Sequence, residues 1–193
     1  MSDALPTASV PDEAIAVLHF WFIELMPENW FGSSEEIDRE IESRFADLLE
    51  KAASGALDHW ADTPRGRLAL IIVLDQFSRN IHRDSALAYT QDTKAQALVC
   101  EALDGGEDER LGMDERQFLY MPLMHAEDIE LQQRGIERFT ALAGTASNVI
   151  DYARKHRDII ERFGRFPYRN EVLERLSTDA ERKFVEEEGN PFS

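Results

Sequence analysis

Three stretches of the sequence gather the polar side chains best suited to bind a ligand or to catalyse a reaction. They are Leu74–Arg83 (LDQFSRNIHR), Tyr120–Asp128 (YMPLMHAED) and Arg162–Asn170 (RFGRFPYRN). Guanidinium groups bind carboxylates and phosphates through paired hydrogen bonds, so these arginines predict recognition of an anion. With one histidine from outside the stretches, the candidate ligand-binding residues are Asp75, Arg79, Asn80, Arg83, His125, Glu127, Asp128, His156, Arg165, Arg169 and Asn170.

The charge pattern of these stretches suggests that their arginines need partners. Asp75, Arg79 and Arg83 are spaced i, i+4, i+8, which predicts one shared helix face and an ion pair between Asp75 and Arg79. They follow the apolar run Leu68–Leu74, so we expect them to be half-buried. The stretch Arg162–Asn170 has three arginines and no acid, in a chain whose net charge is −17.

Two interpretations of that positive stretch stay open. The acids that follow His125 supply three negative charges, Glu127, Asp128 and Glu130, which can neutralise three arginines in a purely structural ion-pair network. Adjacent acids also suit the first turn of a helix, where the helix dipole favours them. Alternatively, an anion-binding cleft is formed, with neutral donors from Asn80 and Asn170 and with cations from Arg79, Arg83, Arg165 and Arg169.

A hydrolase is the competing chemical hypothesis. It uses His125 or His156 as a general base, with Glu127 or Asp128 orienting it or holding a metal ion. The spacing His-x-Glu-Asp differs from that of zinc proteases, and neighbouring acids on a helix point about 100° apart, so we predict no metal site. His156 lies within an apolar helical stripe, which favours a hydrogen-bonded core histidine. The sequence leaves open whether the protein is an enzyme.

Composition excludes several classes of partner. A chain of 193 residues with 38 acidic and 21 basic residues repels nucleic acid and anionic membranes. The longest apolar run, Leu68–Leu74, is far shorter than the roughly 20 residues of a membrane span. The single Cys100 and the lack of a basic segment at the start favour the reducing cytoplasm. No phosphate loop or dinucleotide motif is present, so we predict no cofactor.

The hydrophobic periodicity is helical almost throughout, and no alternating β-branched run occurs. We therefore predict an all-α single domain, residues 1–193, with about eight to nine helices and a loosely held arm and tail. Capping signals occur at Ser33 with Glu36, at Thr63 before Pro64, and at Thr178 with Glu181. Glycines at 55, 144 and 164 end helices, and the expected helices include 12–25, 86–103, 114–124, 126–142, 147–163 and 178–187.

The three polar stretches, with the aromatic groups Phe20–Phe22 and Trp30-Phe31, closely resemble the bacterial family catalogued as domain of unknown function 924. The resemblance covers about residues 14–187 and implies a tetratricopeptide-like array of antiparallel helical hairpins. It implies no activity. The chain departs from the family pattern at Ala126, Tyr168 and Glu174, where a serine, a histidine and a glycine are usual. A mechanism that needs that serine or histidine fails here, which favours charge recognition.

The function best supported by the sequence is that of a binding module. Its arginine-lined pocket is expected to hold an anionic small molecule or the end of an acidic peptide. The hydrolase and the purely structural ion-pair network are the alternatives. The sequence does not give the ligand or the oligomeric state.

Overall fold

A computed structural model describes residues 9–32, 34–143 and 147–192 of the chain. Over these residues the protein is helical and contains no strand, which confirms the all-α single domain. None of the helices in the described part has the length and apolar character needed to cross a membrane. The helices are α1 (Asp12–His19), α2 (Glu35–Ala53), α3 (Pro64–Ile71), α4 (Ser78–Ile81), α5 (Asp92–Asp104), α6 (Met113–Met124), α7 (Ile129–Ala143), α8 (Ser147–Phe163) and α9 (Asp179–Glu188).

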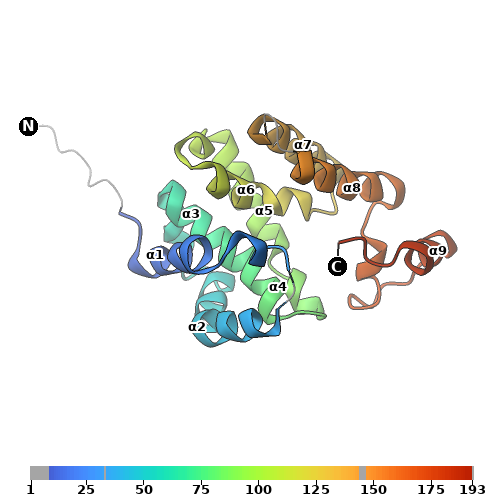
Figure 1. The fold of residues 1–193 in the computed structure, drawn as a ribbon, viewed down its shortest axis with the longest axis horizontal. Coiled ribbons are helices and arrows are strands. Elements are labelled where there is room, and N and C mark those ends of the chain that lie inside the picture. The colour runs from blue at the N-terminus through green and yellow to red at the C-terminus, as the bar shows by residue number, and fades with distance from the viewer. Residues whose placement is uncertain (1–8, 33, 144–146, 193) are drawn as a thin grey trace, which may run out of the picture.

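The centre of the molecule is one continuous helical rod, made of α3, a π-helical segment Ile72–Phe77 and α4 (Figure 1). It begins as the sequence predicts, with the Thr63 hydroxyl accepting the Gly66 N–H at 3.1 Å and with Pro64 at the first helical position. Every residue from Gly66 to Ser78 is buried, so the rod is surrounded on all sides. Segments of π-helix are rare and are often found at functional sites.

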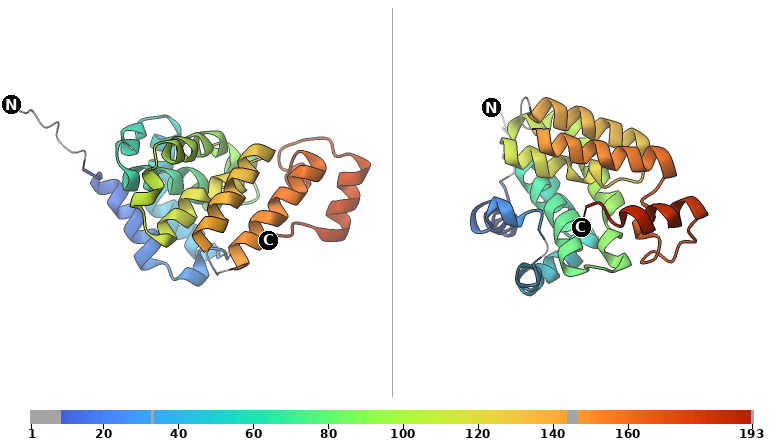
Figure 2. Two further views of the ribbon diagram at one scale, coloured as in Figure 1. Left: turned by 90° about the horizontal axis from the view of Figure 1, so that it is seen from above. Right: turned by 45° about the vertical axis from the view of Figure 1, so that its right-hand side comes forward.

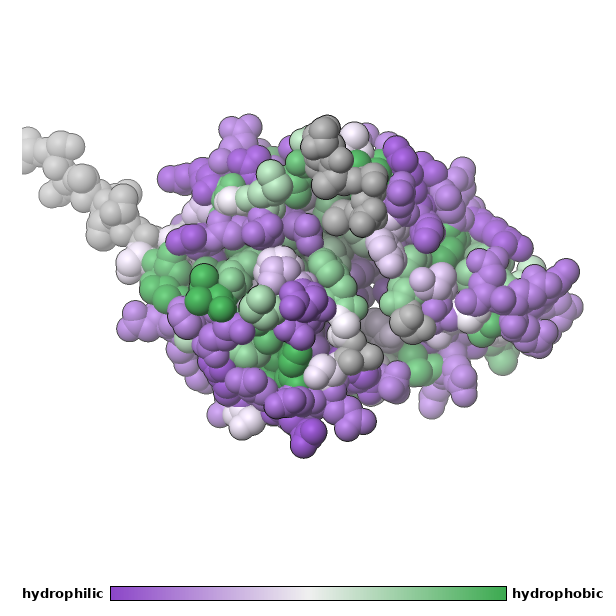
Figure 3. All heavy atoms as spheres, viewed as in Figure 1, coloured by the Kyte–Doolittle hydropathy of each residue, from purple (hydrophilic) through white to green (hydrophobic). Residues whose placement is uncertain are grey.

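Helices pack against this rod on two sides. Helices α1 and α2 pack against it on one side and α5 and α6 on the other, and α6, α7 and α8 then pack in succession (Figures 1 and 2). The tetratricopeptide-like detail of this packing stays a prediction. Hydrophilic side chains cover most of one face of the molecule, with apolar side chains gathered over α1 (Figure 3).

A second, smaller hydrophobic cluster lies apart from the main core. It joins the C-terminal end of α8 to α9 through Ile159, Ile160, Phe166 and Phe184. Gly164 ends α8 with a φ of 70°, a left-handed conformation that suits glycine, and its N–H donates to the Ile160 carbonyl. The predicted capping box at Thr178 and Glu181 opens α9. Helix α9 is therefore held mainly by local contacts and by this small cluster.

Several helix boundaries differ from the sequence-based expectation. The helix expected over 86–103 is a 3₁₀ turn, Ala86–Tyr89, followed by α5 from Asp92, because the Ser85 hydroxyl accepts the Leu87 N–H and starts a separate short turn. Helix α7 begins at Ile129 and not at residue 126, because the side chain of Asp128 caps its N-terminus. The N-terminal cap of α2 is Ser34. The cap predicted at Ser33, the break at Gly144 and most of the expected N-terminal arm lie outside the described residues.

Candidate functional site

The first and second polar stretches meet at a buried carboxylate. Asp75 lies on the π-helical segment, its side chain is 1% exposed, and its two oxygens lie 2.9 and 3.0 Å from Nδ1 of His125. Arg79 pairs with the same carboxylate at 2.9 Å, as the i, i+4 spacing predicts, and Gln76 donates to it at 2.6 Å. Burial opposes ionisation, but Arg79 and His125 hold the pKa of Asp75 well below its usual range.

Because the carboxylate of Asp75 is ionised, it fixes the tautomer of His125. Nδ1 carries the proton and donates it to Asp75, which leaves Nε2 as the acceptor nitrogen. Burial lowers the pKa of His125, although the charge of Asp75 opposes that shift. The ring is therefore neutral at pH 7 and held in one orientation.

The third stretch joins this group through Asp92, the first residue of α5. The carboxylate of Asp92 lies 2.9 Å from Nη1 of Arg79 and 3.6 Å from Nη1 of Arg169. Two arginines that are 90 residues apart in the sequence thus share one carboxylate. Asp92 was not among the predicted site residues because its position fell inside a longer expected helix, where an acid in the first helical turn was its only signal.

Arg169 is a buried cation with few partners. The residue is 6% exposed, and its guanidinium lies between the rings of Tyr89 and Phe166, at 4.5 and 4.4 Å from their centroids. Among the described residues it makes one hydrogen bond, from Nη1 to the His125 carbonyl at 3.3 Å, and its buried Nε has none. Burial and the nearby Arg79 lower its pKa from the usual value, while the guanidinium stays charged.

Arg169 lines a cavity of about 420 Å³, which we call the Arg169 cavity. Its walls come from three segments: residues 86–96, 125–128 and 169–173. Four of the candidate residues line it, His125, Glu127, Asp128 and Arg169, and Asp92 and Tyr89 are its other titratable groups. Asp75 and Arg79 do not line the cavity themselves, but they contact residues that do.

Of the four predicted arginines, Arg169 alone lines this cavity, which corrects the four-arginine cleft. Arg83 lies beyond the end of α4, off the face that carries Asp75 and Arg79, and forms a bidentate pair with Asp38 at 2.6 and 2.7 Å. Asn80 donates to the same carboxylate at 2.8 Å. Arg165 pairs with Glu181 on α9 at 2.6 and 2.8 Å.

Glu127, an acid of the second stretch, pairs with an arginine outside the third stretch. Glu127 accepts two hydrogen bonds from Arg175, at 2.6 and 3.0 Å, and one from the Phe166 N–H. Burial would raise the pKa of Glu127, but the bonds from Arg175 lower it overall. Asn170 accepts from Arg175 and donates to Ser177, so it stays within this network. Arg175 was missed because it lies outside the three stretches.

His156 lies behind His125, with ring centroids 6.3 Å apart. Its Nδ1 donates to the Tyr152 carbonyl at 2.8 Å, and Phe192 stacks on the ring at 3.6 Å. Burial lowers the pKa of His156 to about 3. These contacts match a neutral core histidine, and the ring does not line the Arg169 cavity.

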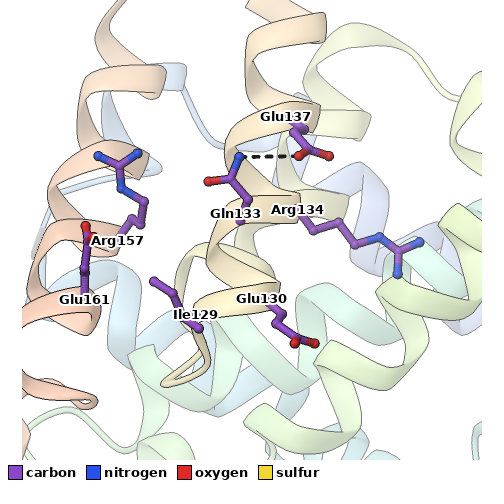
Figure 4. Close-up of a pocket in the computed structure, with 7 residues that line it drawn as sticks. All are labelled: Ile129, Glu130, Gln133, Arg134, Glu137, Arg157 and Glu161. Atoms are coloured by element: carbon purple, nitrogen blue, oxygen red, sulfur yellow. Dashed lines mark hydrogen bonds between the residues drawn. The ribbon is translucent and has the colours of Figure 1, made fainter.

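A second cavity, of about 500 Å³, lies between α7 and α8 and contains none of the candidate residues (Figure 4). Its two arginines have partners at its edge: Arg134 pairs with Asp104 and Arg157 with Asp158. Within the described ranges, no group of three or more histidine, cysteine or acidic side chains is placed to hold a metal ion. The Arg169 cavity is therefore the candidate site.

Comparison with known proteins gives two matches and one negative result. Residues 17–189 match the model of the family described as bacterial protein of unknown function, DUF924. The solved structure of a protein of unknown function from Agrobacterium tumefaciens is 39% identical, covers 91% of this chain and 97% of its own, and superposes with a TM-score of 0.84. No curated protein matches the chain.

Proposed function

We propose a binding function from the premise that this chain belongs to the DUF924 family of bacterial proteins of unknown function. The Arg169 cavity receives a carboxylate or phosphate group, either from an anionic small molecule or from the end of an acidic peptide. The protein acts as a binding module, and the anionic group lies against the guanidinium of Arg169.

The observation that carries this proposal is the poor compensation of Arg169. A buried guanidinium has five N–H donors, and burying them without partners costs free energy. Here one donor is used at 3.3 Å and the nearest carboxylate, 3.6 Å away, is shared with Arg79. An anion in the cavity would supply the missing charge and acceptors, and its binding would be strengthened by the low dielectric constant of a half-enclosed site.

Calorimetric titration tests the proposal directly. The probes are inorganic phosphate, small phosphorylated metabolites, and short peptides with either a free or an amidated carboxyl end. Wild type is compared with Arg169→Gln and with Arg157→Gln, which removes an arginine from the second cavity. We expect Arg169→Gln to weaken binding at least tenfold and Arg157→Gln to leave it unchanged.

The opposite result would contradict the proposal: no probe binds, or Arg169→Gln binds as tightly as wild type. Loss of binding in Arg157→Gln alone would place the ligand between α7 and α8. Because Arg169 is buried, the circular dichroism spectrum and melting temperature of each variant must be measured first. Arg169→Lys, which keeps the charge without the planar fork, provides the second readout if Arg169→Gln is unfolded.

The pairing of Asp75 with His125 favours a second candidate, a hydrolase with His125 as general base. The oriented, neutral ring in the wall of the cavity has a free nitrogen able to accept a proton from water. A panel of phosphoester and amide substrates with wild type and His125→Gln tests it. Two results support a general base: His125→Gln abolishes turnover, and wild-type turnover falls as the pH is lowered through the pKa of a single group. If wild type turns over none of the substrates, this candidate is wrong.

A further inference from the structure

An exposed acid with no basic partner among the described side chains, Asp128, lines the same cavity as the poorly compensated Arg169. We infer that the ligand is a zwitterion, an amino-acid-like molecule whose acidic group lies at Arg169 and whose ammonium group lies at Asp128. This inference rests on the proposed function and narrows its ligand to one charge class. The two residues do not form an ion pair with each other, so neither satisfies the other.

Asp128 is an acid of the Arg169 cavity that is exposed to solvent. Its Oδ1 accepts the N–H groups of Glu130 and Leu131, both at 2.9 Å, and so caps the N-terminus of α7. No basic side chain of the described residues pairs with it, and its Oδ2 makes no hydrogen bond there. The helix end offers only about half a positive charge. The other two acids differ, because Asp92 is paired with Arg79 and Glu127 with Arg175.

The balance of charge around the cavity disfavours a ligand with several negative charges. Asp92, Glu127 and Asp128 on the walls and Asp75 behind them carry four negative charges, against three positive charges from Arg169 and the partner arginines Arg79 and Arg175. A polyphosphate would lie against these carboxylates and would approach a protein of net charge −17. A zwitterion has no net charge, and therefore its approach is not opposed at long range.

The size and the neutral walls of the cavity fit one small molecule. A volume of about 420 Å³ lies in the range of roughly 300–1,000 Å³ typical of small-molecule sites. The neutral residues Thr90, Thr93 and Leu173 are among those that line it. His125 adds a neutral acceptor, and that nitrogen can receive a second ammonium hydrogen. A free amino acid with a short or apolar side chain satisfies all of these groups together.

Sets of three matched probes separate the charge classes. The standard amino acids are compared with their N-acetyl derivatives, which are anions, and with their amides, which are cations, by calorimetry at one pH and salt concentration. We expect at least one amino acid to bind, with both of its derivatives at least tenfold weaker. Asp128→Asn keeps a good helix cap while removing the charge, so it should reduce this preference at least fivefold without changing the fold. Asp151→Asn, at an exposed acid on α8, is the control.

The outcomes distinguish this inference from the proposal on which it rests. If N-acetyl derivatives bind as tightly as the amino acids, or if Asp128→Asn leaves the preference unchanged, the zwitterion is wrong and the Arg169 anion site stands. If the amino acids and every probe of the proposed function fail to bind wild type, the inference and the proposed function are both wrong. Retained amino-acid binding in Arg169→Gln would also contradict both.

Discussion

Asp75 and Arg169 are both buried charges, but their surroundings differ. Asp75 accepts hydrogen bonds from two side chains besides its ion pair. Arg169 has one hydrogen bond and a long ion pair with Asp92, a carboxylate that also pairs with Arg79. A fully compensated buried charge is part of the folded structure, and removing it leaves its partners unpaired. A poorly compensated one is free to take part in binding. At the scale of single residues, the difference in compensation identifies Asp75 as a structural group and Arg169 as the candidate ligand contact.

Replacing Asp75 with asparagine should therefore destabilise the protein. The change leaves the Arg79 guanidinium with one carboxylate in place of two and replaces the charged acceptor of His125 with a neutral amide, and breaking a buried ion pair costs about 3–5 kcal/mol. Urea unfolding would measure the loss. Asp151→Asn disrupts an exposed pair with Arg154 and should change the free energy of unfolding by less than about 0.5 kcal/mol. Equal small effects would show that Asp75 is not a buried structural charge.

The buried ring of His156 should make stability depend on pH. Burial lowers its pKa from 6.5 to about 3, so below pH 6.5 the unfolded chain binds a proton that the folded protein does not. Stability is then fully present above pH 6.5 and falls as the pH is lowered toward 3, by up to about 1.4 kcal/mol per unit from this ring. Denaturant unfolding of wild type and His156→Gln between pH 7 and 5 should show a shallower slope in the variant. The exposed His59→Gln is the control, and parallel slopes for wild type and His156→Gln would refute the expectation.

At the scale of elements, the helical rod Pro64–Ile81 places the candidate site. Its π-helical segment carries Asp75, which contacts His125 at the C-terminal end of α6, and Arg79 on α4 contacts Asp92 at the start of α5; the rod itself is buried from Gly66 to Ser78. A charged group that emerges from so rigid an element has little freedom to move. The position of the site therefore depends on where the rod begins, at Pro64, and on how closely the preceding turn Asp58–Asp62 packs against it.

Gly66 tests that close packing. A Cβ at this position would lie 2.2 Å from the Trp60 carbonyl oxygen, a backbone atom that cannot rotate away. Alanine gains about 1 kcal/mol of helix propensity over glycine, but overpacking costs about 1–3 kcal/mol, and a contact this short lies at the upper end. We expect Gly66→Ala to lower the free energy of unfolding. Gly32→Ala, whose nearest contact is 3.7 Å, should have little effect, and a Gly66→Ala protein as stable as wild type would show that the backbone adjusts.

At the scale of the whole molecule, two hydrophobic clusters of unequal size hold the chain together. The main core includes residues from α1 to α8, and the small one joins α9 to the end of α8. Arg169 lies on the short turn Pro167–Arg169 between these helices, so the small cluster holds this wall of the cavity. Local opening of α9 would cost less than unfolding of the main core, because less apolar surface is exposed.

Hydrogen exchange should separate the two clusters. Phe184→Ala removes the main α9 contribution to the small cluster, and we expect the amides of α9 to exchange at least tenfold faster while those of α3 change little. Phe45→Ala in the main core should instead accelerate exchange throughout. Equal acceleration of α3 and α9 in Phe184→Ala would mean that the molecule unfolds as one unit.

Local sequence signals were enough to predict most of the helices and one part of the site. The helix expected at 147–163 has those bounds, the caps at Thr63 and Thr178 form, and Asp75 pairs with Arg79 four residues later. Each of these depends on residues within one or two turns, where helical geometry fixes the neighbours in advance. The all-α class follows from the same periodicity.

The tertiary structure alone decided which charges meet. Arg169 shares Asp92, Arg165 pairs with Glu181, and Glu127 pairs with Arg175 across 48 residues. An ion pair between distant segments depends on how helices pack, and many pairings of 17 arginines with 38 acids are equally consistent with the sequence. Packing selects among them by burial, since a charge removed from water must find a partner. The same packing buries Arg169 with only a distant carboxylate, on the wall of a cavity that the exposed Asp128 also lines.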